Sequence, residues 1–347
     1  MIVKNEARCL ARCLESVRGI VDEIVVADTG STDGTQTIAR QYGARVCDFA
    51  WRDDFAAARN YALEQTTGDW ILVLDADEHA SEALCAEIRD FVQGEPAVGR
   101  LRIVSDFRKN EQMRSQTFVS RLFPRGARFE GRIHEQLVST LPRRNLRAEL
   151  WHDGYLEGGK SDRNVKLLLG ELERSPKSAY YQFQLGIEYV SLGRADKAFE
   201  CLREAFDLAK GEEPFAPNVV VEFLYVLMEL KRFEVGLEVI QRTGSRLDDF
   251  PDYHLVCGLF YMELVRSDVR KHIAYLPRVE ACYKRCLELG ESDRYKSVRG
   301  TGSFLAQYNL GVLYHVFDDE PGARRCFESA AQDGYAPAAQ MLEKLKG

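Results

Sequence analysis

The stretch Leu72-Val73-Leu74-Asp75-Ala76-Asp77-Glu78 is an apolar run that ends in two carboxylates one residue apart. In a β-strand, residues i and i+2 point to the same side of the sheet, so we expect Asp75 and Asp77 to reach one divalent cation just beyond the strand end. Mg²⁺ and Mn²⁺ prefer a few carboxylates together with phosphate oxygens to a cage built only from protein. The stretch therefore outlines a site for a metal-bound diphosphate, although a D-x-D sequence at a strand end is also common as a turn or helix cap.

A second strand-to-loop junction lies upstream, where Glu23-Ile24-Val25-Val26-Ala27 leads into Asp28-Thr29-Gly30-Ser31-Thr32-Asp33-Gly34. Apolar residues at helical spacing follow the turn, which indicates a βα unit. Capping and turn formation account for the polar and glycine residues after Asp28. Because ligands of open α/β sheets bind beyond the carboxyl ends of strands, we expect the Asp28 carboxylate to accept a hydrogen bond from a bound base or ribose.

Four segments carry a family resemblance. They are Met1-Ile2-Val3-Lys4-Asn5-Glu6, the turn from Asp28 to Thr35, Ala58-Arg59-Asn60-Tyr61-Ala62, and the stretch from Trp70 to Glu78. In order and spacing they resemble the family 2 glycosyltransferases, inverting enzymes of the GT-A fold that use nucleotide-activated sugars. The resemblance covers roughly residues 1 to 155.

The resemblance implies roles for particular residues. Asp28 would contact the nucleobase, Arg59 would lie near the diphosphate, and Asp75 and Asp77 would hold Mn²⁺ or Mg²⁺. Lys4 and Glu6 of the first segment are further candidates for donor binding, as is Asp75. Many family members have two successive Asp where this chain has Asp28-Thr29, which puts contacts made by a second carboxylate in doubt.

A later pair of segments resembles a subgroup of the same family, in which a His-Glu pair and a His-x-Gly-Tyr sequence follow the D-x-D motif. Here they are Ile133-His134-Glu135-Gln136 and Trp151-His152-Asp153-Gly154-Tyr155. An inverting transferase needs a base that deprotonates the acceptor hydroxyl. Glu135 is the first candidate and Asp153 the second, and His134 is the alternative catalytic residue. Regular strand alternation would put His134 and Glu135 on opposite faces.

His152 follows a strand-like segment, and GT-A enzymes often place a His metal ligand there. We therefore expect His152 to be a third metal ligand beside Asp75 and Asp77. A structural, hydrogen-bonded histidine is the alternative for both His134 and His152.

The C-terminal half repeats with a period of about 34 to 38 residues, which is the tetratricopeptide range. Leu185-Gly186-x-x-Tyr189 and Leu310-Gly311-x-x-Tyr314 open the first and last units, and two degenerate units lie between them. The second of these is stretched by an insertion around Arg266 to Leu276. Glycine at the eighth position would let paired helices approach closely. Stacked helix pairs form a concave binding surface without chemistry of its own.

Composition limits the other possibilities. The net charge of −7 argues against nonspecific nucleic-acid binding. Nine cysteines without a C-x-x-C pair fit a cytoplasmic protein better than a disulfide scaffold or zinc site. No apolar run approaches the ~18 residues of a transmembrane helix. Only Met1-Ile2-Val3 precede the first turn, fewer than the common five or six residues of a strand, so we expect the natural start to lie upstream.

The sequence thus predicts a doubly wound α/β GT-A domain over residues 1–157 and an all-α tetratricopeptide-like solenoid over 163–347. The predicted function is metal-dependent, inverting transfer of a sugar from a nucleotide-sugar, which we expect to be a UDP-sugar. The acceptor would be a peptide, protein or cell-surface glycan held by the repeats, and homo-oligomers are possible. A noncatalytic repeat scaffold and a nucleotidyltransferase are the alternatives, although the latter usually carries a Gly-rich phosphate loop that is absent near the N-terminus.

Overall fold

The computed structural model describes residues 1–108, 113–152 and 160–345. It divides into two compact units. The first comprises Met1–Phe107 and Gln116–Gly158, and the second comprises Arg108–Ser115 and Gly159–Gly347. The domain boundaries at residues 157 and 163 stay a prediction. They assign Arg108–Ser115 to the α/β domain, whereas this division assigns that segment to the second unit. The candidate base Asp153 lies outside the described residues.

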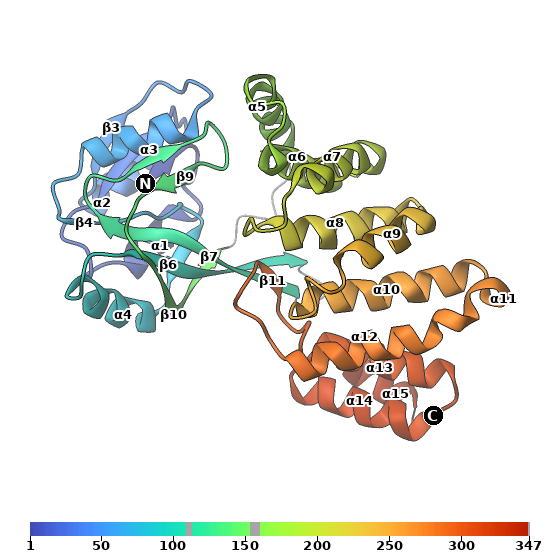
Figure 1. Cartoon of the computed structure of the whole chain (residues 1–347). Coiled ribbons are helices and arrows are strands. Elements are labelled where there is room, and N and C mark those ends of the chain that lie inside the picture. Colours follow the sequence, from blue (N-terminus) through green and yellow to red (C-terminus); the bar gives the residue numbers. More distant parts are fainter. Residues whose placement is uncertain (109–112, 153–159, 346–347) are drawn as a thin grey trace. The chain divides into compact units, whose positions relative to one another are not determined.

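The first unit is an α/β domain whose strands form separate sheets (Figure 1). One is parallel, with the order β1-β2-β3. The other is mixed, with the order β7-β6-β10-β5 and with β4 paired to β7, and β8 and β9 form a small third sheet. The strands are β1 (Ile2–Val3), β2 (Val25–Asp28), β3 (Arg45–Asp48), β4 (Trp70–Leu72), β5 (Glu78–Ala80), β6 (Val98–Arg108), β7 (Met113–Pro124), β8 (Arg128–Glu130), β9 (Gln136–Val138) and β10 (Arg143–His152). The helices are α1 (Leu10–Ser16), α2 (Thr35–Gln41), α3 (Phe55–Glu64) and α4 (Glu82–Val92).

Helices cover both faces of the parallel sheet, as the doubly wound prediction requires. Val26 packs among buried residues of α1 and α2, including Leu10 and Ala39. Its neighbour Ala27 packs instead against Ala58 and Ala62 of α3. Successive residues of a strand point to opposite faces, so this alternation places α1 and α2 on one side and α3 on the other.

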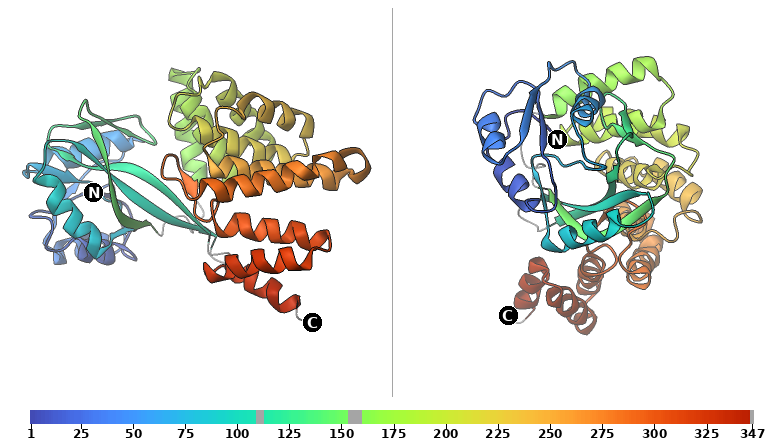
Figure 2. Two further views of the ribbon diagram at one scale, coloured as in Figure 1. Left: turned by 60° about the horizontal axis from the view of Figure 1, so that its bottom comes forward. Right: turned by 90° about the vertical axis from the view of Figure 1, so that its left-hand side faces the viewer.

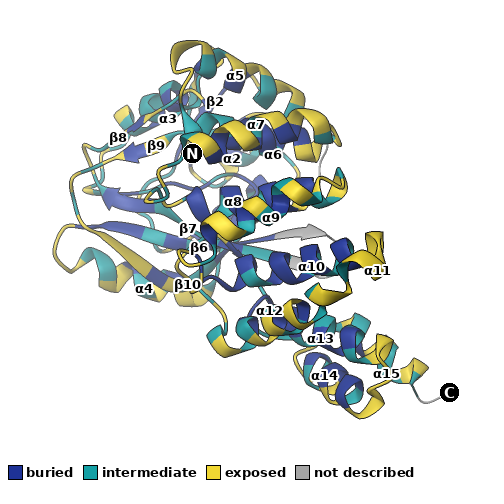
Figure 3. Ribbon diagram, turned by 45° about the vertical axis from the view of Figure 1, so that its right-hand side comes forward, coloured by how far each residue is buried: buried dark blue, intermediate teal, exposed yellow. Residues whose placement is uncertain are grey.

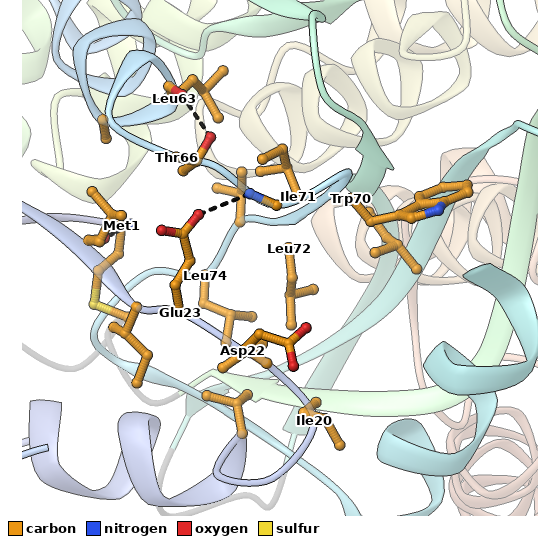
Figure 4. Close-up of a pocket in the computed structure, with 18 of the residues that line it drawn as sticks. Met1, Ile20, Asp22, Glu23, Leu63, Thr66, Trp70, Ile71, Leu72 and Leu74 are labelled. Carbon is orange, nitrogen blue, oxygen red and sulfur yellow. Dashed lines mark hydrogen bonds between the residues drawn. The ribbon is translucent and has the colours of Figure 1, made fainter. Parts of the chain in front are cut away.

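An apolar pocket of about 330 Å³ lies where the parallel sheet and the mixed sheet approach each other (Figure 4). Ile2 and Val25 line it from the parallel sheet, and Trp70, Ile71 and Leu72 line it from β4. β1 is only two residues long and pairs with β2. A natural start upstream of Met1 stays a prediction.

The second unit is a stack of antiparallel helix pairs in chain order (Figures 1 and 2). The helices bury one face and expose the other, as Figure 3 shows. The elements are α5 (Lys160–Arg174), α6 (Ala179–Ser191), α7 (Ala195–Leu208), α8 (Ala216–Glu229), α9 (Phe233–Thr243), α10 (Pro251–Ser267), α11 (Val269–His272), η2 (Ile273–Tyr275), α12 (Leu276–Leu289), β11 (Ser297–Val298), α13 (Phe304–Val316), α14 (Glu320–Gln332) and α15 (Ala336–Lys344). The predicted insertion in the third pair is confirmed, because α11 and η2 lie between α10 and α12. No helix among the described residues is long and apolar enough to cross a membrane.

The first residues of β7, up to Ser115, belong to this second unit. There the backbone N–H of Arg299, next to β11, donates to the carbonyl of Arg114 at 2.8 Å. The loop before α13 is anchored by the buried Asp252 of α10, which accepts hydrogen bonds from Ser297, Val298 and Thr301. Burial raises the pKa of Asp252 to about 6.

The glycines at the eighth repeat position lie at close helix contacts, as predicted. A Cβ built on Gly186 would lie 2.7 Å from Leu202, and one on Gly311 would lie 2.8 Å from Phe327. Phe327 is fully buried. In both pairs the second helix therefore leaves no room for a side chain at this position.

Gly311→Ala is expected to destabilise the second unit by about 1 to 3 kcal/mol, since the methyl group would overpack against Phe327. Gly170→Ala in α5 is the matched control, because a Cβ there meets nothing within 4 Å. The control should gain about 0.5 to 1 kcal/mol from helix propensity. Urea unfolding followed by circular dichroism measures both free energies, and equal effects would contradict the close-contact explanation.

Candidate functional site

The two carboxylate oxygens of Asp28, the last residue of β2, differ in their hydrogen bonding. Oδ1 accepts hydrogen bonds from the backbone N–H groups of Gly30 and Ser31, both at 2.8 Å. Burial raises the pKa of this carboxyl, but the hydrogen bonds from Ser31 and Gly30 outweigh burial and hold it below its usual value. Oδ2 is buried and has no hydrogen-bond partner among the described residues. A buried, ionised acceptor of this kind is suited to an N–H or O–H donor on a ligand.

The N-terminal segment is bound to the turn that follows Asp28. The backbone N–H of Asn5 donates to Ser31 Oγ at 2.9 Å, and its side chain accepts from the N–H of Thr32 at 2.8 Å. The N–H of Glu6 donates to Thr35 Oγ1 at 2.8 Å, whereas the Glu6 carboxylate accepts from the thiol of Cys9. The segment thus reaches the Asp28 turn through Asn5 and through backbone atoms, and Lys4 is exposed. Donor-binding roles for Lys4 and Glu6 stay predictions.

The D-x-D stretch is a turn and does not have the strand geometry that the sequence suggested. β4 ends at Leu72, and Ala76 and Asp77 form a turn before β5. Asp75 directs its carboxylate to two arginines: Oδ1 accepts from Arg59 Nη2 at 2.9 Å, and Oδ2 accepts from Arg121 Nη2 at 2.7 Å. Burial opposes ionisation, yet Arg121 and Arg59 hold the pKa of Asp75 well below its usual value. The prediction of a strand reaching Asp75 is wrong because the turn has its own hydrogen bonds.

Arg59 of α3 links Asp75 to Glu135. Its Nε donates to Glu135 Oε1 while Nη2 donates to Asp75. The side chains of Arg59 and Glu135 are 11% and 10% exposed, so this ion pair is screened little by solvent. The remaining nitrogen, Nη1, is buried without a hydrogen-bond partner among the described residues. Arg59 therefore retains one nitrogen, Nη1, that is available to donate a hydrogen bond to an anion.

Glu135 does not follow a regular strand, contrary to the premise of the face-alternation argument. Residues 131–134 form a bend, and His134 has a left-handed backbone with φ of 52°. His134 accepts through its carbonyl from the side chain of Gln136 at 2.9 Å. The structure thus brings Glu135 to the Arg59–Asp75 pair, and alternation cannot decide between His134 and Glu135 as the base.

Asp77 faces His152, the last residue of β10. Asp77 Oδ2 lies 3.4 Å from His152 Nε2, and His152 Nδ1 lies 3.2 Å from Ser105 Oγ. Burial lowers the pKa of His152, but the hydrogen bond and charge of Asp77 raise it more, so the net shift is upward. Antiparallel pairing of β5 and β10 sets this contact, with His152 opposite Glu78.

Residues 1–143 match the model of Glycosyl transferase family 2. These residues form a glycosyltransferase family 2 domain. A TPR repeat-containing protein of Synechococcus elongatus is 34% identical over 268 residues, covering 72% of this chain and 65% of its own. The SPbeta prophage-derived glycosyltransferase SunS of Bacillus subtilis is 26% identical, covering 60% of this chain and 52% of its own. The chain thus spans less than two thirds of either relative.

Among solved structures, MamA resembles the chain with a TM-score of 0.40 and 15% identity. The match covers 52% of this chain and 92% of MamA.

Asp77 and His152 have the donor chemistry that a metal ion in the family 2 domain would need. One carboxylate and one imidazole suit Mn²⁺, and such ions take their other ligands from water and substrate phosphates. Among the described residues, no group of three or more His, Cys, Asp or Glu side chains is arranged to hold a metal. The donor set therefore fits an ion that is completed by a diphosphate, with Asp75 bound instead to the two arginines.

Two residues of the family 2 domain were not predicted as site residues. Arg121 of β7 and Glu78 of β5 are buried, 8% and 2% exposed, and contact each other and Asp75. Burial raises the pKa of Glu78 to about 7, against the lowering effect of Arg121. A signal for Glu78 was its place directly after the D-x-D motif. Arg121 is 46 residues from Asp75 and is brought near by pairing of β4 with β7.

His152→Ala in the family 2 domain is expected to raise the Mn²⁺ concentration needed for half-maximal donor hydrolysis by about 10 to 100-fold. The imidazole is a neutral ligand, so its loss should weaken the ion without adding repulsion. His79→Ala is the matched control, because His79 lies on the paired strand β5 next to Glu78 and opposite Trp151. The test is donor hydrolysis measured as a function of Mn²⁺ concentration for both variants. The same Mn²⁺ dependence in both would exclude His152 as a ligand.

Proposed function

We propose that this protein transfers a sugar from a nucleotide-sugar, a UDP-sugar, to a hydroxyl or related nucleophile of a peptide, protein or glycan, with inversion at the anomeric carbon. The family 2 domain and the glycosyltransferase name of a relative support glycosyl transfer. The observation that carries the proposal is the presence in that domain of two buried atoms without a hydrogen-bond partner among the described residues, Asp28 Oδ2 and Arg59 Nη1, together with the Asp77–His152 pair.

Each part of a nucleotide-sugar has a matching group in this domain. The Asp28 carboxylate would accept the N–H of a uracil ring or a ribose hydroxyl. Arg59 would donate its free Nη1 to a diphosphate oxygen. Packing of α3 against β2, through Ala58 and Ala27, keeps Arg59 on the helix that covers this strand.

Glu135 would act as the general base. It would take the proton from the acceptor hydroxyl as that oxygen attacks the anomeric carbon, while the bond from this carbon to the diphosphate oxygen breaks and the diphosphate leaves with the electron pair. Attack opposite the leaving group gives inversion. Asp77 and His152 would hold Mn²⁺ or Mg²⁺, which when bound would neutralise charge on the leaving diphosphate.

The helical unit would hold the acceptor, because stacked helix pairs offer extended binding surfaces. One relative is named as a TPR repeat-containing protein and another as a glycosyltransferase, and both names are in keeping with this division of roles. Acceptor identity and a cytoplasmic location are part of the proposal and rest on the sequence.

A hydrolysis screen of the full chain tests the proposal. Several nucleotide-sugars are incubated with Mn²⁺ and without acceptor, and release of the nucleoside diphosphate is measured. We expect slow hydrolysis of one UDP-sugar and loss of hydrolysis with EDTA. Absence of both hydrolysis and nucleotide binding across the panel would favour a noncatalytic scaffold, and release of pyrophosphate from a nucleoside triphosphate would favour a nucleotidyltransferase.

A further inference from the structure

A closed ring of hydrogen bonds surrounds the turn from Asp75 to Glu78. Nη2 of Arg121 donates to Asp75 Oδ2 at 2.7 Å and to Glu78 Oε1 at 2.6 Å. The other carboxylate oxygen of Glu78 accepts from the backbone N–H of Asp75 at 2.8 Å. The backbone N–H of Glu78 donates to the carbonyl of Asp75 at 3.0 Å. The turn is thus fixed from its first residue to its last by one arginine and one glutamate.

Asp77 is between Asp75 and Glu78 in the sequence, so its position depends on how these two residues are held. Glu78 is also the residue of β5 that pairs with His152 of β10. The side chain of Glu78 therefore fixes the turn while its backbone lies opposite His152. The distance of 3.4 Å between Asp77 Oδ2 and His152 Nε2 follows from both constraints.

The ring contains more buried charge than a turn of this length needs. Removing charges from water is costly, and an apolar side chain often serves equally well where only stability is required. In addition, Arg121 Nε is buried without a hydrogen-bond partner among the described residues. Incompletely satisfied buried polar groups are uncommon and occur at functional sites.

We propose that Arg121 and Glu78 are positioning residues of the metal site. They hold the turn so that the Asp77 carboxylate and the His152 imidazole face the same ion, and they act through Asp75 and the backbone without touching the ion. This inference rests on the proposed function and assigns residues that the D-x-D motif alone does not include.

The experiment compares Mn²⁺ binding by the full chain with UDP present, measured by the electron paramagnetic resonance of free Mn²⁺. Arg121→Met is expected to weaken Mn²⁺ binding by about 10 to 100-fold, as loss of residues that orient ligands usually does. Glu78→Gln should weaken it in the same direction and by less, because the amide keeps an acceptor for the Asp75 N–H. Arg125→Met is the matched control, since the Arg125 side chain is 53% exposed and lies four residues further on.

Turnover against Mn²⁺ concentration gives a second measure. A positioning role raises the Mn²⁺ concentration for half-maximal donor hydrolysis and leaves the rate at saturating Mn²⁺ within a few-fold of wild type. Arg121→Lys should restore part of the affinity that Arg121→Met loses, because the amine can still bond one carboxylate.

The outcomes separate this inference from the proposed function. Wild-type protein that binds neither Mn²⁺ nor UDP would overturn the proposed function and this inference with it. Wild-type protein that binds both, with Arg121→Met and Glu78→Gln matching Arg125→Met, would overturn the positioning role alone. If Arg121→Met does not fold by circular dichroism, Arg121→Lys and Glu78→Gln decide, and unchanged Mn²⁺ affinity in both would overturn the inference.

Discussion

Glu135→Gln is expected to lower the rate of sugar transfer by about 10² to 10⁴-fold while donor affinity stays near the wild-type value. The amide oxygen of glutamine can still accept from Arg59 Nε, the donor that Glu135 Oε1 now pairs with. The variant therefore removes the basicity and keeps the contact. Transfer rate and UDP-sugar affinity are measured on the same preparation, by product formation and by calorimetry.

The control is His134→Ala, because His134 is the residue directly before Glu135 and ends the bend. Loss of transfer in the His134 variant with binding intact, together with an active Glu135 variant, would reverse the two roles. A third result is informative as well. If Glu135→Gln loses donor affinity in proportion to its rate, Glu135 serves to hold Arg59 and is not the base.

Asp77→Asn is expected to weaken UDP binding in the presence of Mn²⁺ by about 100-fold or more, the upper end of what loss of a group around a metal costs. The substitution keeps the shape of the side chain and removes the charge that the ion needs. UDP is titrated into wild type and variant with Mn²⁺ and again with EDTA. The two proteins should differ with Mn²⁺ and agree with EDTA. Equal affinity under both conditions would exclude Asp77 as a metal ligand.

Features that depend on neighbours in sequence were predictable. Asp28 lies at the end of its strand as expected, because a β-branched run followed by a glycine-rich turn specifies that junction locally. Gly186 and Gly311 lie at close helix contacts because the repeat period fixes which residues of a helix face its partner. The family resemblance likewise covered contiguous segments, and the family model matches the same region.

Features that depend on long-range pairing were not predictable in the same way. Asp75 and Asp77 have different partners because Glu78 binds the backbone N–H of Asp75 and turns the chain there. Arg121 reaches Asp75 only because β7 pairs with β4, in a register that places Leu72 opposite Leu122. No local periodicity in the sequence encodes that register, so the sequence could suggest the D-x-D residues and could not show which of them meets arginine.

The ion-pair network of Arg59, Arg121, Asp75, Glu78 and Glu135 limits how this sequence can change over evolution. Two cations and three carboxylates share their partners. Losing one member leaves its partner charged, little hydrated and without a counter-charge, whereas losing a cation and its carboxylate together removes both charges. The effects of substitutions here should therefore be strongly non-additive. In related sequences, an arginine of the network and its acidic partner should be replaced together. A homologue without Arg121 should therefore also lack an acid at the position of Glu78.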